Sequence, residues 1–204
     1  MPAECSSAEE ALEALAQGET EVVMGTEDWD AVEMDGDELE SVCAAIGRAA
    51  PLRFLSLHRE DGLGEEGAAQ LGRAVGDNCR GETALLSLYC AHNALDGAAA
   101  VALLGALPLR GLVRLQLDFN CIGDDGAKAL AKALKEDKGA VETPLEVSLF
   151  RNAVTGDGGR ALADGVEANE RITALHLDAN HYILSESHDR IAAVLRRNRE
   201  RLGL

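Results

Sequence analysis

The chain has 204 residues and a formal net charge of −17, and 47% of its residues are hydrophobic while only 3% are aromatic. A chain of this length buries about 70% of its unfolded surface, so we expect one core of aliphatic side chains. The negative balance argues against a nucleic-acid partner, which needs a basic stripe, and the longest nearly apolar run, Ala98–Leu109, is too short for membrane insertion.

The N-terminal part of the chain is strongly acidic. Residues 1–47 carry 14 Asp and Glu residues and no Lys or Arg. Within this part, Ala8–Gln17 is predicted to form a short helix, and Glu21–Met24 could form a strand. We interpret residues 1–28 as an acidic N-terminal cap. Its carboxylates either form a solvated surface that aids solubility or steer a basic partner surface toward the protein.

Residues 29–184 contain a repeated phrase: leucine, two residues, leucine, one residue, leucine, two residues and asparagine. Four units end at Asn93, Asn120, Asn152 and Asn180, which are 27, 32 and 28 residues apart. Self-similarity at this period is typical of stacked repeats, which present an extended concave surface and usually function by binding. The apolar positions of the four units are Leu85–Leu88–Cys90, Leu112–Leu115–Leu117, Pro144–Val147–Leu149 and Ile172–Leu175–Leu177.

Each unit predicts a strand, a turn and a helix. The apolar residues of the phrase alternate with others, so they share one face of a short strand. Asparagine suits the following turn because its side chain bonds backbone groups that the turn leaves unpaired. After Asn120 the apolar residues recur at helical spacing, at Ala127, Leu130, Ala131 and Leu134.

The outer units depart from the phrase, as expected of repeats that cover the open ends of a stack. Leu52–Leu55–Leu57 has one extra residue before its glycine turn, so Glu60 or Asp61 replaces the asparagine, and Trp29–Val32–Met34 is degenerate. At the other end, residues 185–204 are predicted to form an amphipathic capping helix rich in arginine. The solenoid would then have a negative front end and a positive back end.

Units of the form LxxLxLxxNxIGxxGAxxLAxAL resemble the ribonuclease-inhibitor-like class of leucine-rich repeats. Similar repeats occur in NOD-like receptors and in the GTPase-activating protein of Ran. The resemblance implies an α/β leucine-rich repeat solenoid, a horseshoe arc with parallel strands on the concave face and helices on the convex face. We expect about five or six repeats in a single structural domain.

Strings that suggest catalysis have a structural explanation. Gly62–Gly67 matches the GxGxxG pattern, but the unit of Asn120 carries glycines in the same slot, and Glu65 and Glu66 would repel a pyrophosphate. The acidic stretch 27–37 lacks calcium-loop spacing, and the five histidines show no zinc-ligand spacing. We therefore expect no catalytic residue, no metal, no cofactor and no enzymatic activity.

The cysteines and the N-terminus indicate an intracellular, cytoplasmic protein that is not secreted. Five cysteines form an odd set without a CxxC motif, which favours reduced thiols. The first ten residues have neither the basic start nor the apolar stretch of a signal peptide.

Residues that alternate with the core positions are predicted to face outward along the concave side. Aromatic residues and arginine are the usual anchors of protein interfaces, and several of the few aromatics occupy these positions. In the alternative arrangement, Phe54 and Phe119 fold over the strand edge and pack on neighbouring repeats. The predicted partner-binding residues are His58, Tyr89, His92, Arg114, Gln116, Phe119, Ser148, Phe150 and His176.

These features favour a non-enzymatic protein–protein interaction module, either a scaffold or a subunit of a larger assembly. Two alternatives remain open: an inhibitor that masks a basic protein, and a GTPase-activating protein of the Ran-directed type. The catalytic arginine of the latter family cannot be placed on any residue here. A homo-oligomer is not expected because both ends are predicted to be capped, although their opposite charges would favour stacking.

Overall fold

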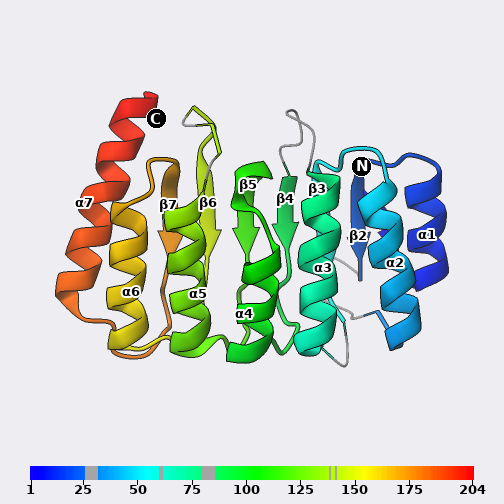
Figure 1. The fold of residues 1–204 in the computed structure, drawn as a ribbon, viewed down its shortest axis with the longest axis horizontal. Coiled ribbons are helices and arrows are strands. Elements are labelled where there is room, and N and C mark those ends of the chain that lie inside the picture. The colour runs from blue at the N-terminus through cyan, green and yellow to red at the C-terminus, as the bar shows by residue number, and fades with distance from the viewer. Residues whose placement is uncertain (26–31, 60–61, 80–85, 138, 141) are drawn as a thin grey trace.

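The computed structural model describes the chain apart from residues 26–31, 60–61, 80–85, 138 and 141. The described residues form one sheet of seven parallel strands in the sequential order β1 to β7 (Figure 1). The strands are β1 (Ala3–Cys5), β2 (Glu21–Met24), β3 (Phe54–Leu57), β4 (Leu86–Tyr89), β5 (Leu112–Gln116), β6 (Leu145–Ser148) and β7 (Ile172–His176).

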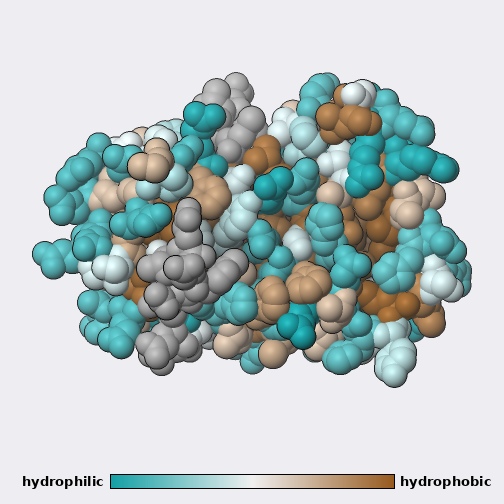
Figure 2. All heavy atoms as spheres, turned by 180° about the vertical axis from the view of Figure 1, so that it is seen from behind, coloured by the Kyte–Doolittle hydropathy of each residue, from teal (hydrophilic) through white to brown (hydrophobic). Residues whose placement is uncertain are grey.

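A helix follows each strand, and the helices lie side by side over one face of the sheet (Figure 1). They are α1 (Ala8–Ala16), α2 (Gly36–Arg48), α3 (Gly64–Asn78), α4 (Gly97–Ala106), α5 (Gly123–Glu136), α6 (Gly156–Glu167) and α7 (Ser185–Leu202). A short 3₁₀ helix, η1 (Leu109–Gly111), precedes β5. Figure 2 views the molecule from behind, from the side of the sheet opposite to the helices. This arrangement confirms the predicted leucine-rich repeat solenoid.

The core consists of rows of aliphatic side chains that run from unit to unit. The parallel register aligns Leu55, Leu88, Leu115, Val147 and Leu175 as successive partners across five strands. All five are buried between the sheet and the helices. Because each unit repeats the same alternation, every strand adds one more row member to the same core.

Asparagine side chains connect the turns of neighbouring units. Oδ1 of Asn120 accepts hydrogen bonds from the amides of Asn93 and Leu95, both at 3.0 Å. Its Nδ2 donates to the carbonyl of Cys90 at 3.0 Å and to that of Leu117 at 2.9 Å. Asn93, Asn152 and Asn180 bond in the same way, to the unit before them and within their own turn. The asparagines therefore bond the turn backbone as predicted, and we call these four residues the asparagine ladder.

The residue before each ladder asparagine adopts a left-handed backbone. The φ values are 56° at His92, 55° at Phe119, 54° at Arg151 and 57° at Ala179. Such a conformation costs a non-glycine residue about 1–2 kcal/mol. The hydrogen bonds of the asparagine that follows offset this cost, so the strain persists in every complete unit.

The structure confirms the expected strand at Glu21–Met24 but corrects the assignment of the unit that follows it. Glu21–Met24 forms β2 and pairs with β3, whereas Val32 makes only an isolated bridge to Arg59. Trp29 lies outside the described residues. The described part of this unit, Val32–Met34, therefore contains no strand, and the described residues form seven strands where five or six repeats were expected. The degenerate unit misled the assignment because Val32 and Met34 are buried without belonging to a strand.

One pairing within the repeats differs from expectation, and two other expected positions lie outside the described residues. The register between β4 and β5 shifts at Leu86, which pairs with Leu112, while Leu85 lies outside the described residues. Leu145, rather than Pro144, pairs with Ile172 through a similar shift. In the unit of β3, Glu60 and Asp61 lie outside the described residues. There, the amide of Arg59 donates to Asn93 Oδ1 at 3.1 Å, in the way that the amides of Asn93 and Asn152 donate to Asn120 and Asn180.

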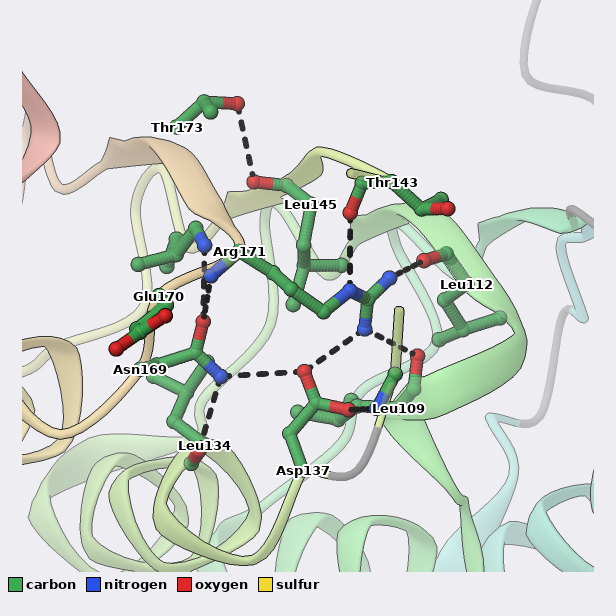
Figure 3. Close-up of polar contacts among 12 residues, drawn as sticks. Leu109, Leu112, Leu134, Asp137, Thr143, Leu145, Asn169, Glu170, Arg171 and Thr173 are labelled. Atoms are coloured by element: carbon green, nitrogen blue, oxygen red, sulfur yellow. Dashed lines mark hydrogen bonds and ion pairs between the residues drawn. The ribbon is translucent and has the colours of Figure 1, made fainter. Parts of the chain in front are cut away.

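A buried arginine joins three units at the amino ends of the strands (Figure 3). Arg171 forms an ion pair with Asp137 at 2.7 Å, and both side chains are almost fully buried, with exposures of 3% and 0%. Its guanidinium also donates to the carbonyls of Leu109, Leu112 and Thr143. Arg171 therefore reaches from the unit of β7 across the unit of β6 to the unit of β5.

The C-terminal helix packs against α6 and β7, and Ile191, Val194 and Leu195 on its inner side are buried. The arginines of this helix are engaged within the chain. Arg190 pairs with Asp164 and Glu167, and Arg201 pairs with Glu170. Arg190 and Arg201 of the positive back end are thus paired with carboxylates, whereas Arg197 and Arg199 donate to the side-chain oxygen of Asn198 and the carbonyl of Thr173. The boundaries at residues 28 and 184 stay predictions.

Four of the five free cysteines are buried, and Cys121 is exposed. Burial raises the pKa of Cys43 and of Cys90 to about 12, and that of Cys79 to about 11. Burial also raises the pKa of Cys5. Because the thiolate is the reactive form, these four thiols are inert in the folded protein.

We expect iodoacetamide at pH 8 to alkylate only Cys121 in the folded protein, as measured by intact mass and peptide mapping. The same reagent in urea should modify all five cysteines. Rapid native alkylation of Cys43 or Cys90 would contradict the buried positions of these thiols.

Replacement of Asn120 by alanine should lower the free energy of unfolding by about 3 kcal/mol, because it leaves buried amides and a carbonyl without partners. Urea denaturation followed by circular dichroism measures the change. Asn180→Ala is the matched control, since the half-buried Asn180 is open to water that can replace its bonds, and it should cost about 1 kcal/mol. Equal losses for the two variants would argue against the ladder.

Replacement of Arg171 by alanine should destabilise the protein by about 3–5 kcal/mol, because Asp137 is left as a buried charge without its partner. The double variant Arg171→Ala/Asp137→Ala should recover part of this loss. Arg201→Ala, which breaks an exposed pair, should cost less than about 1 kcal/mol. Thermal denaturation compares the three variants, and a double variant no better than Arg171→Ala would refute the explanation.

Candidate protein-interaction surface

The concave face presents the residues that alternate with the core positions. Seen from this side, hydrophilic residues lie between apolar ones across the sheet (Figure 2). Most of these side chains are half-buried, because neighbouring strands hold them close together. Ala91, Asp118 and Ala174, which were also predicted to face outward, are buried.

A row of rings crosses four units along the carboxyl ends of the strands. The ring centroids of His58 and His92 are 5.7 Å apart, and those of His92 and Phe119 are 4.3 Å apart and stacked. Phe119 meets Phe150 edge to face at 5.2 Å. The guanidinium carbon of Arg151 lies 5.5 Å from the centroid of Phe119. We call these five residues the ring row.

The left-handed turns position this row. His92, Phe119 and Arg151 precede ladder asparagines and share the same positive φ, so their side chains project at the same level of successive units. Phe119 is 38% exposed despite its two ring neighbours. The row is thus an ordered aromatic strip at the rim of the sheet, with one face open to solvent.

A second group lies on the strands themselves. Phe54 and Tyr89 pack with ring centroids 4.9 Å apart. Arg114 donates to Tyr89 Oη at 3.0 Å and to Glu146 through Nε and Nη2 at 3.0 and 2.5 Å. These hydrogen bonds with Tyr89 and Glu146 raise the pKa of Arg114. The guanidinium is therefore fixed between two units.

Asp118 organises the middle of the face. Its Oδ1 accepts from Ser148 Oγ at 2.5 Å and from the amide of Phe150 at 2.8 Å, and its Oδ2 accepts from Gln116 at 2.9 Å. The carboxylate replaces a strand carbonyl as acceptor for Phe150. Asp118 therefore holds the side chains of Gln116 and Ser148 and the backbone amide of Phe150 in place.

A hollow of about 360 Å³ opens beside this network. Phe150 forms an aromatic wall, and Glu146 and Asp178 contribute carboxylates. Its remaining lining residues are Arg114, Gln116, Asp118, Val147, Ser148 and His176. The hollow and the ring row share Phe150, so they form one continuous surface.

The nine residues predicted as partner-binding separate into these neighbouring groups. His58, His92, Phe119 and Phe150 belong to the ring row. Tyr89 accepts a hydrogen bond from Arg114. The hollow is lined by Arg114, Gln116, Ser148 and His176. The predicted alternative for Phe54 and Phe119 also holds in part, since both pack on rings of adjacent units.

Sequence reasoning did not anticipate the role of Asp118 or Asp178. The aspartate one residue after the third apolar position recurs in the units of Asn120 and Asn180, and this recurrence was a usable signal. In the described part of the chain, no group of three or more His, Cys, Asp or Glu residues is placed to hold a metal ion. None of the described helices is long and apolar enough to cross a bilayer.

Comparison with known proteins agrees with this geometry. A family model described as a leucine-rich repeat matches residues 112–131. A search of curated proteins by sequence finds no match. The chain is similar in structure to actin-binding site 2 of leiomodin-1, with a TM-score of 0.57 and 18% identity over 94% of this chain and 89% of that one.

It is also similar to the C-terminal domain of tropomodulin from Caenorhabditis elegans. The TM-score is 0.51 and the identity 14%, over 96% of this chain and 95% of that one. Identities this low establish a shared fold and nothing further. The repeat match, the asparagine ladder and these structural neighbours agree on the fold, which is a leucine-rich repeat solenoid.

Proposed function

We propose that this protein is a non-enzymatic, cytoplasmic interaction module, acting as a scaffold or as a subunit of a larger assembly, and that it binds a protein partner through its concave face. The ring row carries this proposal. Four adjoining rings and a guanidinium form an anchor strip, and the asparagine ladder positions His92, Phe119 and Arg151 within it. Rigid aromatic side chains contribute interface area at little cost in conformational entropy.

The proposed contact residues are those predicted from the sequence, extended by four neighbours. Phe54, Asp118, Arg151 and Asp178 join the set because they support or border the same surface. The complete original set is His58, Tyr89, His92, Arg114, Gln116, Phe119, Ser148, Phe150 and His176.

A partner with a basic surface fits this face. Asp178 and Glu146 border the hollow. Residues 1–47, at the opposite end of the sheet, carry 14 carboxylates without a basic residue, and six of these carboxylates lie on α1 and α2. Complementary charges on two protein surfaces increase the association rate more than they increase the affinity of the complex. The same observation favours the second candidate function, an inhibitor that masks a basic protein. We also propose that the repeats belong to the ribonuclease-inhibitor-like subclass, because of the spacing between their units.

The Ran-directed alternative has less support. Arg114 is held by Tyr89 and Glu146, and Arg151 lies over Phe119. Each arginine of this face therefore contacts a side chain of its own chain. A donor that completes the site of a bound GTPase has to leave such contacts.

Tyr89→Ala combined with Phe150→Ala should abolish partner binding and lower stability by only about 1 kcal/mol, since both rings are partly exposed. The test is affinity purification from the native source at low salt, quantified by mass spectrometry. Arg160→Ala, on the outer face of α6, is the control and should retain the partner. Equal recovery on the wild type and on the double variant would exclude the concave face.

The recovered partner distinguishes the candidate functions. A basic protein whose binding weakens steeply with added salt, and whose own activity is blocked, indicates an inhibitor. A basic protein that remains active in the complex indicates a scaffold or a subunit. Accelerated GTP hydrolysis by purified Ran would instead establish the Ran-directed GTPase-activating function and refute the non-enzymatic proposal.

A further inference from the structure

The hollow beside Phe150 lies over a short side chain of the sheet. Parallel pairing places Gln116, Ser148 and His176 in one row across β5, β6 and β7. Ser148 is the smallest of the three, and all three line the hollow, whose volume is about 360 Å³. This volume is near the lower end of the range for ligand pockets, about 300–1,000 Å³, so the hollow has room for one side chain rather than for a helix.

One side of the hollow consists of a ring between two carboxylates. Asp118, Phe150 and Asp178 each stand two residues before a ladder asparagine, so they occupy the same position in three successive units. Because the strands of these units are neighbours in the sheet, Phe150 lies between the two aspartates. All three residues line the hollow. The face of an aromatic ring carries partial negative charge, so the ring and the carboxylates all attract a cation.

The charges that line the hollow are not balanced. Three carboxylates, those of Asp118, Glu146 and Asp178, stand against the single guanidinium of Arg114. Arg114 already pairs with Glu146 at 2.5 Å. Arg151 of the ring row is not among the lining residues. An excess of negative charge therefore remains in the hollow, on Asp118 and Asp178.

Two of the three carboxylates have acceptor atoms that the described residues leave open. Asp118 is 8% exposed and already accepts three hydrogen bonds. Both nitrogens of Arg114 that bond Glu146 donate to its Oε2, and no described residue donates to its Oε1. Within the described part of the chain, the exposed carboxylate of Asp178 accepts no hydrogen bond and forms no ion pair. A ligand with several donors therefore finds free acceptors on Glu146 and Asp178.

A guanidinium matches this arrangement better than an ammonium group. It is planar, carries five N–H donors and stacks on aromatic faces, whereas lysine carries three donors at a single point. The chain already contains one such contact, since the guanidinium carbon of Arg151 lies 5.5 Å from the centroid of the Phe119 ring in the preceding unit. The hollow offers a second ring, Phe150, together with the open oxygens of Asp178 and Glu146.

We propose that this hollow receives one arginine side chain of the partner protein. Asp178 supplies the main anionic contact and Phe150 the aromatic contact. The proposal rests on the function proposed for the concave face, and it specifies the side chain by which that face recognises its partner. A basic surface alone is then insufficient, because the partner has to present an arginine that can enter the hollow.

The test uses short synthetic peptides as probes. One carries a single arginine flanked by glycines, and a second carries citrulline, which has nearly the same shape as arginine but no charge. Each is titrated at low salt into the isotope-labelled intact protein, and amide chemical shifts report binding. The arginine peptide should shift the amides of Ser148, Phe150 and Asp178. The citrulline peptide should bind about tenfold or more weakly, because it lacks both the ionic and the cation–π attraction.

Asp178→Asn should weaken binding of the arginine peptide about threefold or more, because it removes an exposed carboxylate at nearly constant shape. Asp189→Asn is the matched control, since it removes the same charge from an exposed position on α7, and it should leave the affinity unchanged. Three results would overturn the proposal: no shifts at the hollow, a lysine or citrulline peptide that binds as well as the arginine peptide, or unchanged binding to Asp178→Asn.

Recovery of the native partner separates this proposal from the one on which it rests. A partner that is lost from the variant Tyr89→Ala/Phe150→Ala but fully retained by Asp178→Asn would refute the arginine site and leave the concave-face proposal intact. A partner that is retained by both variants would refute the concave face as its binding surface. The peptide titration then decides on its own whether the hollow binds arginine.

Discussion

The satisfaction of backbone hydrogen bonds by buried asparagine is the constraint on which this structure depends. A strand that ends in the interior leaves amides and carbonyls without water, and each unpaired group costs about 1–3 kcal/mol. Asn93, Asn120, Asn152 and Asn180 supply the missing partners between consecutive units. The residue before each asparagine must then adopt a left-handed backbone, and this turn raises its side chain to the rim. Three members of the ring row, His92, Phe119 and Arg151, occupy that one position, so their place in the row is a consequence of the ladder.

The sequence predicts those features that recur at the period of the repeat. The leucine rows, the four ladder asparagines and the outward position of Tyr89 and Phe150 all follow from alternation and spacing. The details that escape prediction arise where the period fails. Leu86 and Leu145 enter the sheet through register shifts that are invisible in the spacing of leucines. The first two strands carry too few leucines for the phrase to identify them.

Contacts between residues distant in sequence escape prediction for a different reason. Charge counting assigns Arg190 and Arg201 to a positive end, but their pairing with Glu167 and Glu170 depends on helix packing that a linear pattern does not contain. Asp118 was placed correctly on the outward side of its strand, yet its burial and its hold on Ser148 and Phe150 come from the next strand. In both cases the repeat pattern predicts the position of a residue on its helix or strand, whereas its contacts depend on the neighbouring units.

The reach of Arg171 changes how the stack comes apart. In a solenoid whose units touch only their neighbours, terminal units can fray one at a time. Arg171 instead bonds to Thr143 in the adjacent unit, and to Asp137, Leu109 and Leu112 at the ends of α5 and β5 one unit further on. Loss of the last strand would therefore break bonds across three units together, so we expect the units of β5 to β7 to open cooperatively. Their backbone amides should then exchange with solvent through a shared opening, whereas those of the N-terminal units should exchange independently.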